Sequence, residues 1–269
     1  MAKLALRKIE KCIFCGGEPT TKEHVWPRWS HRYLPKVKKK WHALHAVEHL
    51  DRTDIEIVKH AGDPLDWQVK CVDEKCNNGW MRQLEDAARP IMLPLMNGTQ
   101  SPIFLGRRQK ETLAAWIALK TIIQEYAPRA SKIAHRSQLK RLWQKKLAPD
   151  RTWKIWIASY DGRAANTLWT AHPMLIVPDS VAARRKSRRA TYFNSEAATY
   201  VIGQLFIHLV RSPHEGLVRK FRFHPDVAVK LLTIWPLSGF DAKWPPESLT
   251  DIEAGYVAWA IRSLVKGSK

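Results

Sequence analysis

The sequence predicts an α+β fold in which a small cysteine-containing module precedes a larger mixed domain. All four cysteines lie within the first 76 of the 269 residues, so a segment held together by a metal ion is expected there. The rest of the chain is long enough to bury a core of its own, since 45% of all residues are hydrophobic. In that part, helical patterns are followed by strand patterns and then by a closing helix, which favours the α+β class.

A change of composition after residue 88 suggests where the module ends. Helix-breaking residues follow one another there and would interrupt any long element. These residues are Pro90, Pro94, Asn97, Gly98 and Pro102. We therefore expect a module over residues 1–88, a linker over 89–110 and a C-terminal α+β domain over 111–269.

Hydrophobic periodicity predicts the individual elements of these parts. Within the module, the turn and cap residues that follow the last cysteine predict a helix from about Trp80 to Ala88. A turn signal at Asp161-Gly162 predicts that the strand before it pairs with the strand after it. In chain order, the C-terminal domain is expected to contain helices over 111–126 and 137–147, strands over 152–160, 167–177, 198–210 and 229–235, and a helix over 249–265.

The cysteines form two pairs, Cys12-x2-Cys15 and Cys71-x4-Cys76, and none is left over. Four thiolates satisfy a tetrahedral zinc ion completely and leave no open coordination position. A closed site of this kind holds together chain segments that are too short to pack by themselves. The spacing therefore predicts one structural zinc ion bound by all four cysteines.

A possible catalytic group lies between and just after these pairs, at Glu23, His24 and Asn77. Histidine has an unperturbed pKa near neutrality, which suits the activation of a water molecule. A divalent cation held by one carboxylate and one amide oxygen keeps coordination sites for phosphate and water. The pattern indicates metal-dependent hydrolysis of a phosphodiester, although neighbours such as Glu23 and His24 point to opposite faces of a regular strand.

The motif C-x2-C, E-H-V-x-P, C-x4-C-N-N-G-W resembles the HNH (ββα-metal, His-Me finger) endonucleases that carry a four-cysteine zinc knot. The resemblance covers about residues 8–86, and the remainder is loosely similar to bacterial HNH proteins with a long C-terminal extension. It implies that His24 is the general base, and that Glu23 and Asn77 bind a catalytic Mg2+ or Mn2+ ion. It also implies that Cys12, Cys15, Cys71 and Cys76 bind zinc.

Two features depart from the family pattern. The second cysteine pair has four intervening residues where two are usual, so we expect a bulge in that part of the zinc site. In addition, no Asn lies between His24 and Cys76 to orient the base. The sequence does not choose among the residues that could replace it, which are His42, His45, His49, Asp63 and Asp66.

The charge of the chain favours a nucleic-acid partner. Lys and Arg outnumber Asp and Glu by 45 to 25, which gives a net charge of +20, and the pI is about 10.0. Basic runs at residues 36–40 and 184–189 would neutralise phosphates and release counterions. We take DNA as the first expectation, although the charge itself does not distinguish DNA from RNA.

Residues 1–11 lack the apolar core of a signal peptide, and the longest apolar stretch, 200–210, is too short to span a bilayer. Thiolates matched to zinc are typical of a reducing compartment, so we expect a cytoplasmic protein without membrane contact. Three hypotheses remain: an HNH endonuclease acting on DNA, an RNase using the same motif, and a catalytically silent zinc protein that binds nucleic acid.

Overall fold

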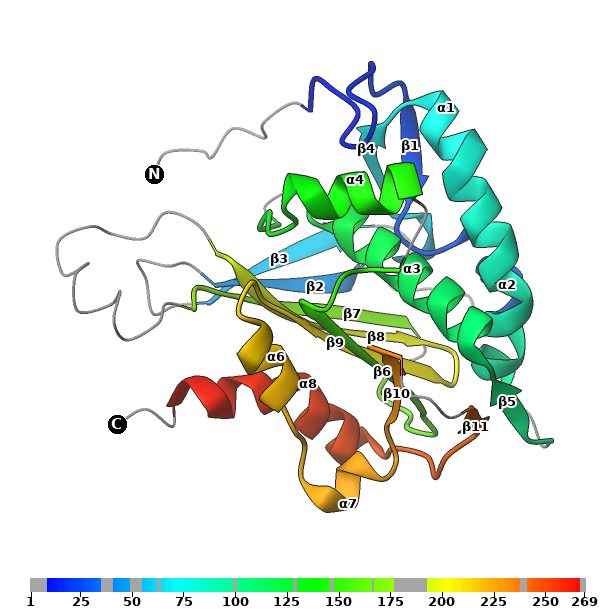
Figure 1. Cartoon of the computed structure of the whole chain (residues 1–269), viewed down its shortest axis with the longest axis vertical. Helices are drawn as coiled ribbons and strands as arrows, with labels where there is room; N and C mark the ends of the chain where they lie inside the picture. The colour runs from blue at the N-terminus through cyan, green and yellow to red at the C-terminus, as the bar shows by residue number, and fades with distance from the viewer. Residues whose placement is uncertain are drawn as a thin grey trace, which may run out of the picture.

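The computed structural model describes residues 9–34, 41–48, 55–61, 64–98, 101–127, 130–145, 148–165, 167–176, 193–237 and 241–266. The fold is of the α+β class, as predicted (Figure 1). Within the part of the chain that is described, no helix is long and apolar enough to cross a membrane.

An antiparallel five-stranded sheet, in the order β10-β6-β9-β8-β7, forms the centre of the fold. The strands are β6 (Trp153–Ser159), β7 (Thr167–Met174), β8 (Ser195–Ile202), β9 (Leu205–Arg211) and β10 (Leu232–Trp235). The single strand predicted over 198–210 is instead the β8–β9 hairpin, because Gly203 turns the chain with a positive φ of 59°. The predicted pairing of β6 with β7 is also wrong, since β6 lies between β9 and β10.

Helices cover both faces of this sheet (Figure 1). On one face lie α3 (Arg107–Gln124) and α4 (Arg136–Lys145), which share a core with Trp153, Ile155 and Ile157 of β6. On the other lie α6 (Glu215–Lys220), α7 (Pro225–Ala228) and α8 (Asp251–Lys266), which pack with Trp156 and Ala158. The alternation of side chains along β6 therefore supplies two separate cores.

The last helix buries a different face from the one its large residues suggested. Ile252, Tyr256 and Trp259, which form an apolar stripe in the sequence, are 86%, 46% and 46% exposed. The buried face of α8 carries the small residues Ala254, Ala258 and Ala260 together with Val257. Small residues of α8 therefore face the sheet, while Ile252 is largely exposed and Trp259 keeps a ring contact with His172 of β7, with centroids 4.6 Å apart.

The N-terminal part is built on two antiparallel strands and a helix. Strand β1 (Thr21–His24) pairs with β4 (Gln68–Val72), and its register shifts between Thr21 and Glu23, so this short strand is irregular. Between these strands lie η1 (Arg28–Tyr33), the hairpin of β2 (Trp41–Glu48) and β3 (Ile55–Ala61), and the turn η2 (Pro64–Asp66). After β4 the chain enters α1 (Glu74–Cys76), the π-helical turn η3 (Asn77–Met81) and α2 (Arg82–Asn97).

The residues predicted as a linker, 89–110, are mostly regular structure. Helix α2 continues through Pro90 and Pro94 and ends before Gly98, which has a positive φ of 68°. Its buried residues recur at helical spacing, and this packing offsets the backbone hydrogen bonds that the prolines cannot make. Strand β5 (Ile103–Leu105) follows and pairs with β11 (Ala242–Trp244). The two predicted domains are thus joined by structured chain.

The core on the α3 and α4 face of the sheet also includes the cysteine-containing segment. It extends from Cys12 and Trp26 through Met92 and Ile122 to Trp244. Helices α2 and α3 pack against each other within it, and Trp26 contacts Tyr200 of β8 with ring centroids 6.2 Å apart. The module predicted over 1–88 therefore lacks a separate core.

Candidate metal and catalytic site

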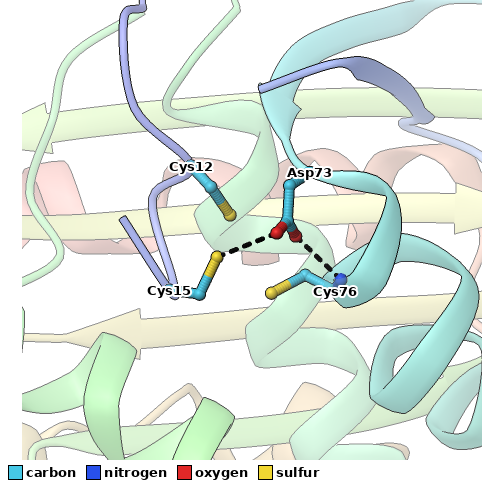
Figure 2. Close-up of side chains that lie close together, drawn as sticks. All are labelled: Cys12, Cys15, Asp73 and Cys76. Carbon is cyan, nitrogen blue, oxygen red and sulfur yellow. Dashed lines mark hydrogen bonds between the residues drawn. The ribbon is translucent and has the colours of Figure 1, made fainter. Parts of the chain in front are cut away.

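Among the residues that the structure describes, one group of side chains has the arrangement of a metal site (Figure 2). It consists of Cys12, Cys15, Asp73 and Cys76, whose ligand atoms all lie within 4.8 Å of one another. Three thiols and one carboxylate fit the tetrahedral coordination of zinc, which accepts sulfur and carboxylate oxygen ligands. The structure thus confirms a candidate metal group and brings together three of the four predicted cysteines.

The two halves of this group come from a tight turn and from a helix start. Gly16 donates its N–H to the carbonyl of Cys12 at 3.0 Å and has a positive φ of 80°, which folds Cys15 back toward Cys12. In the other half, Asp73 caps α1 by accepting the N–H of Cys76 at 2.8 Å. The Cys15 thiol donates to the second carboxylate oxygen of Asp73 at 3.1 Å, which joins the halves.

Cys71 is not part of this group, so the structure does not bring the predicted fourth cysteine ligand to the other three. It is fully buried on β4, where its side chain lies in the hydrophobic core. Burial, together with the nearby Glu23, raises the pKa of the Cys71 thiol far above its ordinary value. Asp73 takes its place, and Asp73-x2-Cys76 restores the two-residue spacing that the second cysteine pair lacked. This Asp-x2-Cys spacing was visible in the sequence, but cysteine spacing alone does not reveal it.

His24 lies at the end of β1, half-buried and opposite Gln68 in the β1–β4 register. Its Nε2 is 2.8 Å from Nε2 of Gln68. Burial lowers the pKa of His24, and the positive charges of His31, Lys120 and Arg28 lower it further, while Glu85 opposes them. Burial and the nearby cations therefore favour the neutral imidazole, the protonation state that a general base requires.

Gln68 is the residue that contacts the imidazole where the family motif has an orienting Asn. Of the five candidates for that role, His49 and Asp63 lie outside the described residues, and of His42 and His45 only the backbone is described. Asp66 is exposed in η2, and no hydrogen bond joins it to His24 in the described part of the chain. Nothing in the motif marks Gln68, whose position follows only from the strand register.

Glu23 is held in a buried ion pair. It is 7% exposed, and its Oε1 lies 2.5 Å from Nζ of Lys120 in α3. The same ammonium donates to the carbonyl of His24 at 3.0 Å and lies 3.5 Å from Oε1 of Glu85. Burial alone would lower the pKa of Lys120, but Glu23 and Glu85 outweigh it and raise that pKa. Lys120 thus forms an ion pair with the carboxylate that was predicted to bind a catalytic ion, so Glu23 does not fit that role in this structure.

Asn77 links the helical segment to β1. Its Nδ2 donates to Oγ1 of Thr21 at 3.1 Å, a bond that does not use the amide oxygen predicted to bind metal. The N-cap of α1 is Asp73, so Asn77 does not serve that helix as the N-cap. The structure therefore brings Asn77 to the first strand, near the start of β1.

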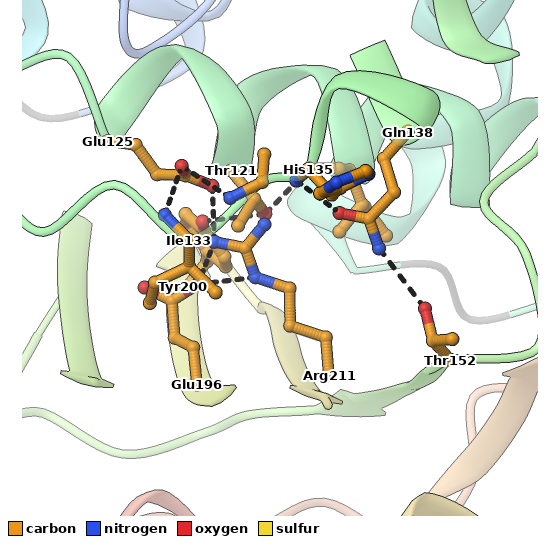
Figure 3. Close-up of polar contacts among 11 residues, drawn as sticks. Thr121, Glu125, Ile133, His135, Gln138, Thr152, Glu196, Tyr200 and Arg211 are labelled. Atoms are coloured by element: carbon orange, nitrogen blue, oxygen red, sulfur yellow. Dashed lines mark hydrogen bonds and ion pairs between the residues drawn. The ribbon is translucent and has the colours of Figure 1, made fainter. Parts of the chain in front are cut away.

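A second cluster of buried charges joins α3 to the sheet (Figure 3). Arg211 of β9 donates from Nε to Glu196 of β8 at 2.9 Å and also pairs with Glu125. Glu125 in turn accepts the N–H groups of Ile133 and Ala134, each at 2.8 Å. All three charged side chains are buried and bind one another, so this cluster links the end of α3 to β8 and β9.

In comparisons with protein-family models, with curated proteins and with solved structures, no family, protein or structure matches this chain. The two basic runs predicted to contact nucleic acid, at residues 36–40 and 184–189, lie outside the described residues. The candidate site accordingly rests on the geometry around the metal group and His24.

Proposed function

We propose that this protein is a zinc-containing nucleic-acid phosphodiesterase, acting first on DNA, in which His24 is the general base. The observation that carries the proposal is the environment of His24: a half-buried imidazole at the end of the strand that follows the metal-binding turn, in contact with Gln68 and with a pKa lowered by burial and nearby cations. A neutral imidazole can take a proton from an attacking water, a contribution worth about 10²–10⁴-fold in rate.

The contact with Gln68 supports this role if the Gln68 carbonyl faces the imidazole. It would then accept a hydrogen bond from protonated Nε2 of His24, leaving the lone pair of Nδ1 free to accept a proton. The alternative orientation directs the Gln68 amide N–H to Nε2 and places the proton on Nδ1. Only the first orientation leaves a ring lone pair of His24 free to accept a proton from water.

Zinc has a structural role in this proposal. Three thiolates from Cys12, Cys15 and Cys76 and the carboxylate of Asp73 would complete its coordination, which leaves no position for substrate. The ion would fix the turn before β1 to the start of the helical segment after β4. Its binding energy would therefore stabilise the part of the chain that positions His24.

The neighbourhood of His24 is suited to a phosphate. Arg28 is exposed in η1 and close enough to lower the pKa of His24 by charge repulsion. Together with the net charge of +20, such a cation favours a polyanionic substrate. Dependence on Mg2+ or Mn2+ remains a prediction from the HNH resemblance, with Asn77 as a candidate ligand and Glu23 reassigned to the ion pair with Lys120.

Digestion of plasmid DNA and of total RNA, with and without added Mg2+ or Mn2+, tests the proposal. We expect His24→Ala to lower cleavage by about 10²–10⁴-fold while zinc content and nucleic-acid binding persist. Gln68→Leu should lower the rate and shift its pH profile, because the imidazole loses its partner. His224→Ala is the matched control, since His224 is exposed and far along the chain in the α7 turn. Full activity in His24→Ala would refute the catalytic assignment.

The Glu23–Lys120 ion pair favours a second candidate, a zinc protein that binds nucleic acid without cutting it. This function needs the metal group and the positive charge but no free carboxylate near His24. Wild-type protein that contains zinc, binds DNA or RNA with a steep salt dependence and cleaves neither in any divalent metal would establish this candidate.

A further inference from the structure

A basic pocket lies on the far side of the sheet from α3, between β6, α6 and β10. Its volume is about 520 Å³, within the range of small-molecule sites. Four of its lining side chains are cationic and one is acidic. The cations are Arg151, Lys154, Arg219 and Arg222, and the acid is Glu215.

The cations of this pocket have donors left for a ligand. Within the described residues, none of the four forms an ion pair with a carboxylate. The Lys154 ammonium has three donors and gives one to the carbonyl of Phe221 at 3.2 Å. Arg222 uses one nitrogen on the carbonyls of Arg219 and Phe221, which fixes the guanidinium at the edge of the pocket.

Lys154 is the least exposed cation of this group. It is half-buried, and its ammonium lies 5.0 Å from the centroid of the Trp156 ring. Burial, assisted by the charge of Arg222, lowers the pKa of Lys154 to about 8. Arg151, Arg219 and Glu215 are the other charged groups facing this space. A cation so placed without a counterion gains stability when an anion enters.

We propose that this pocket binds the phosphate of a nucleotide or of a nucleic-acid strand end. A phosphate monoester carries close to two negative charges at pH 7, which matches an excess of three positive charges better than a single carboxylate does. Arginine guanidinium groups bind phosphate oxygens through paired hydrogen bonds, and Thr233 adds a hydroxyl to the lining. The volume leaves room for a sugar or base beside the phosphate. The site does not depend on His24 being catalytic.

Calorimetric titration of the full-length protein at fixed salt tests the site with inorganic phosphate, adenosine 5′-monophosphate and adenosine. We expect phosphate and the monophosphate to bind and adenosine to bind at least tenfold more weakly. Lys154→Gln and Arg219→Gln should each weaken the monophosphate about tenfold, as expected for the loss of one charge-assisted hydrogen bond. Lys243→Gln removes an equal charge from an exposed position on β11 and should change nothing.

Two oligonucleotides of one sequence, with a 5′-phosphate or a 5′-hydroxyl, identify the source of the phosphate. A preference for the phosphorylated strand that is lost in Lys154→Gln supports a strand end, and equal binding of both strands with tight binding of the monophosphate supports a free nucleotide. Inorganic phosphate, adenosine 5′-monophosphate and adenosine contain no phosphodiester bond. Their titrations therefore test the pocket whether or not the protein is a nuclease. Equal binding of adenosine and its monophosphate, or unchanged affinity in both variants with wild-type thermal unfolding, would overturn the proposal.

Discussion

Replacing Lys120 by Met tests the buried ion pair that occupies Glu23. Lys120 is 3% exposed and its ammonium has three partners, at 2.5 Å, 3.0 Å and 3.5 Å. The substitution leaves the Glu23 carboxylate, itself 7% exposed, without a cation in the core. Removing one partner of a buried pair costs about 3–5 kcal/mol, so we expect a loss of unfolding free energy in that range.

Urea unfolding at pH 7 measures this loss, and a second substitution separates the pair from the packing. In Lys120→Met with Glu23→Gln, no uncompensated carboxylate remains at Glu23, so most of the lost stability should return. Lys230→Met is the control, because the carboxylates paired with Lys230 are more exposed than Glu23. The side chain of Glu247 is 75% exposed and that of Glu253 is 25% exposed. That control should unfold close to the wild type.

The pH dependence gives a further check. Because the pKa of Lys120 is raised above 10.5, its contribution is present below that pH and is lost as the pH rises through the folded-state pKa. The wild type should therefore lose this stability only in strongly alkaline solution, and Lys120→Met should not show that loss. A cost below about 1 kcal/mol in Lys120→Met, or a double variant that loses the sum of both single costs, would refute the ion-pair assignment.

Two other predictions concern buried side chains. Cys71→Ser should retain about one zinc per chain but lose about 1–3 kcal/mol of unfolding free energy, because a hydroxyl enters the core. Cys76→Ser should lose the metal. Elemental analysis measures the zinc content of both variants, and urea unfolding measures their stability. If both variants lose zinc, Cys71 is a ligand after all. Burial lowers the pKa of His208 from 6.5 to about 3, so its contribution is present above pH 6.5 and lost as the pH falls toward 3, by up to roughly 4–5 kcal/mol. His208→Gln should flatten unfolding free energy measured across that window, and an unchanged slope would contradict the assignment.

The sequence was informative wherever the signal is local. Cysteine spacing located Cys12, Cys15 and Cys76, and helical periodicity located α3 and α4 to within a few residues. Alternation located β6, since its side chains face two cores. A two-residue turn at Gly203 is also local, but the apolar run around it hid the break between β8 and β9.

Contacts between distant segments could not be predicted in this way. Lys120 is 97 residues from Glu23 and belongs to a helix whose pattern indicates only an apolar core. Similarly, the pairing of β6 with β9 places Trp153 opposite Arg211, and no turn signal connects them. The metal-binding turn and the histidine of the following strand were therefore predictable, but the distant residues that set the electrostatics around His24 and Glu23 were not.

The shared core has a consequence for the order in which the protein can fold during synthesis. Strand β1 is made early, yet Glu23 receives its cation only when Lys120 has left the ribosome, and Trp26 receives its aromatic neighbour only with Tyr200. Until then, the long-range contacts available to the first hundred or so residues include the β1–β4 pairing, the Asn77–Thr21 hydrogen bond and the metal-binding turn closed by Asp73 and Cys76. Early zinc binding would order the nascent segment before the strands of the central sheet have been synthesised.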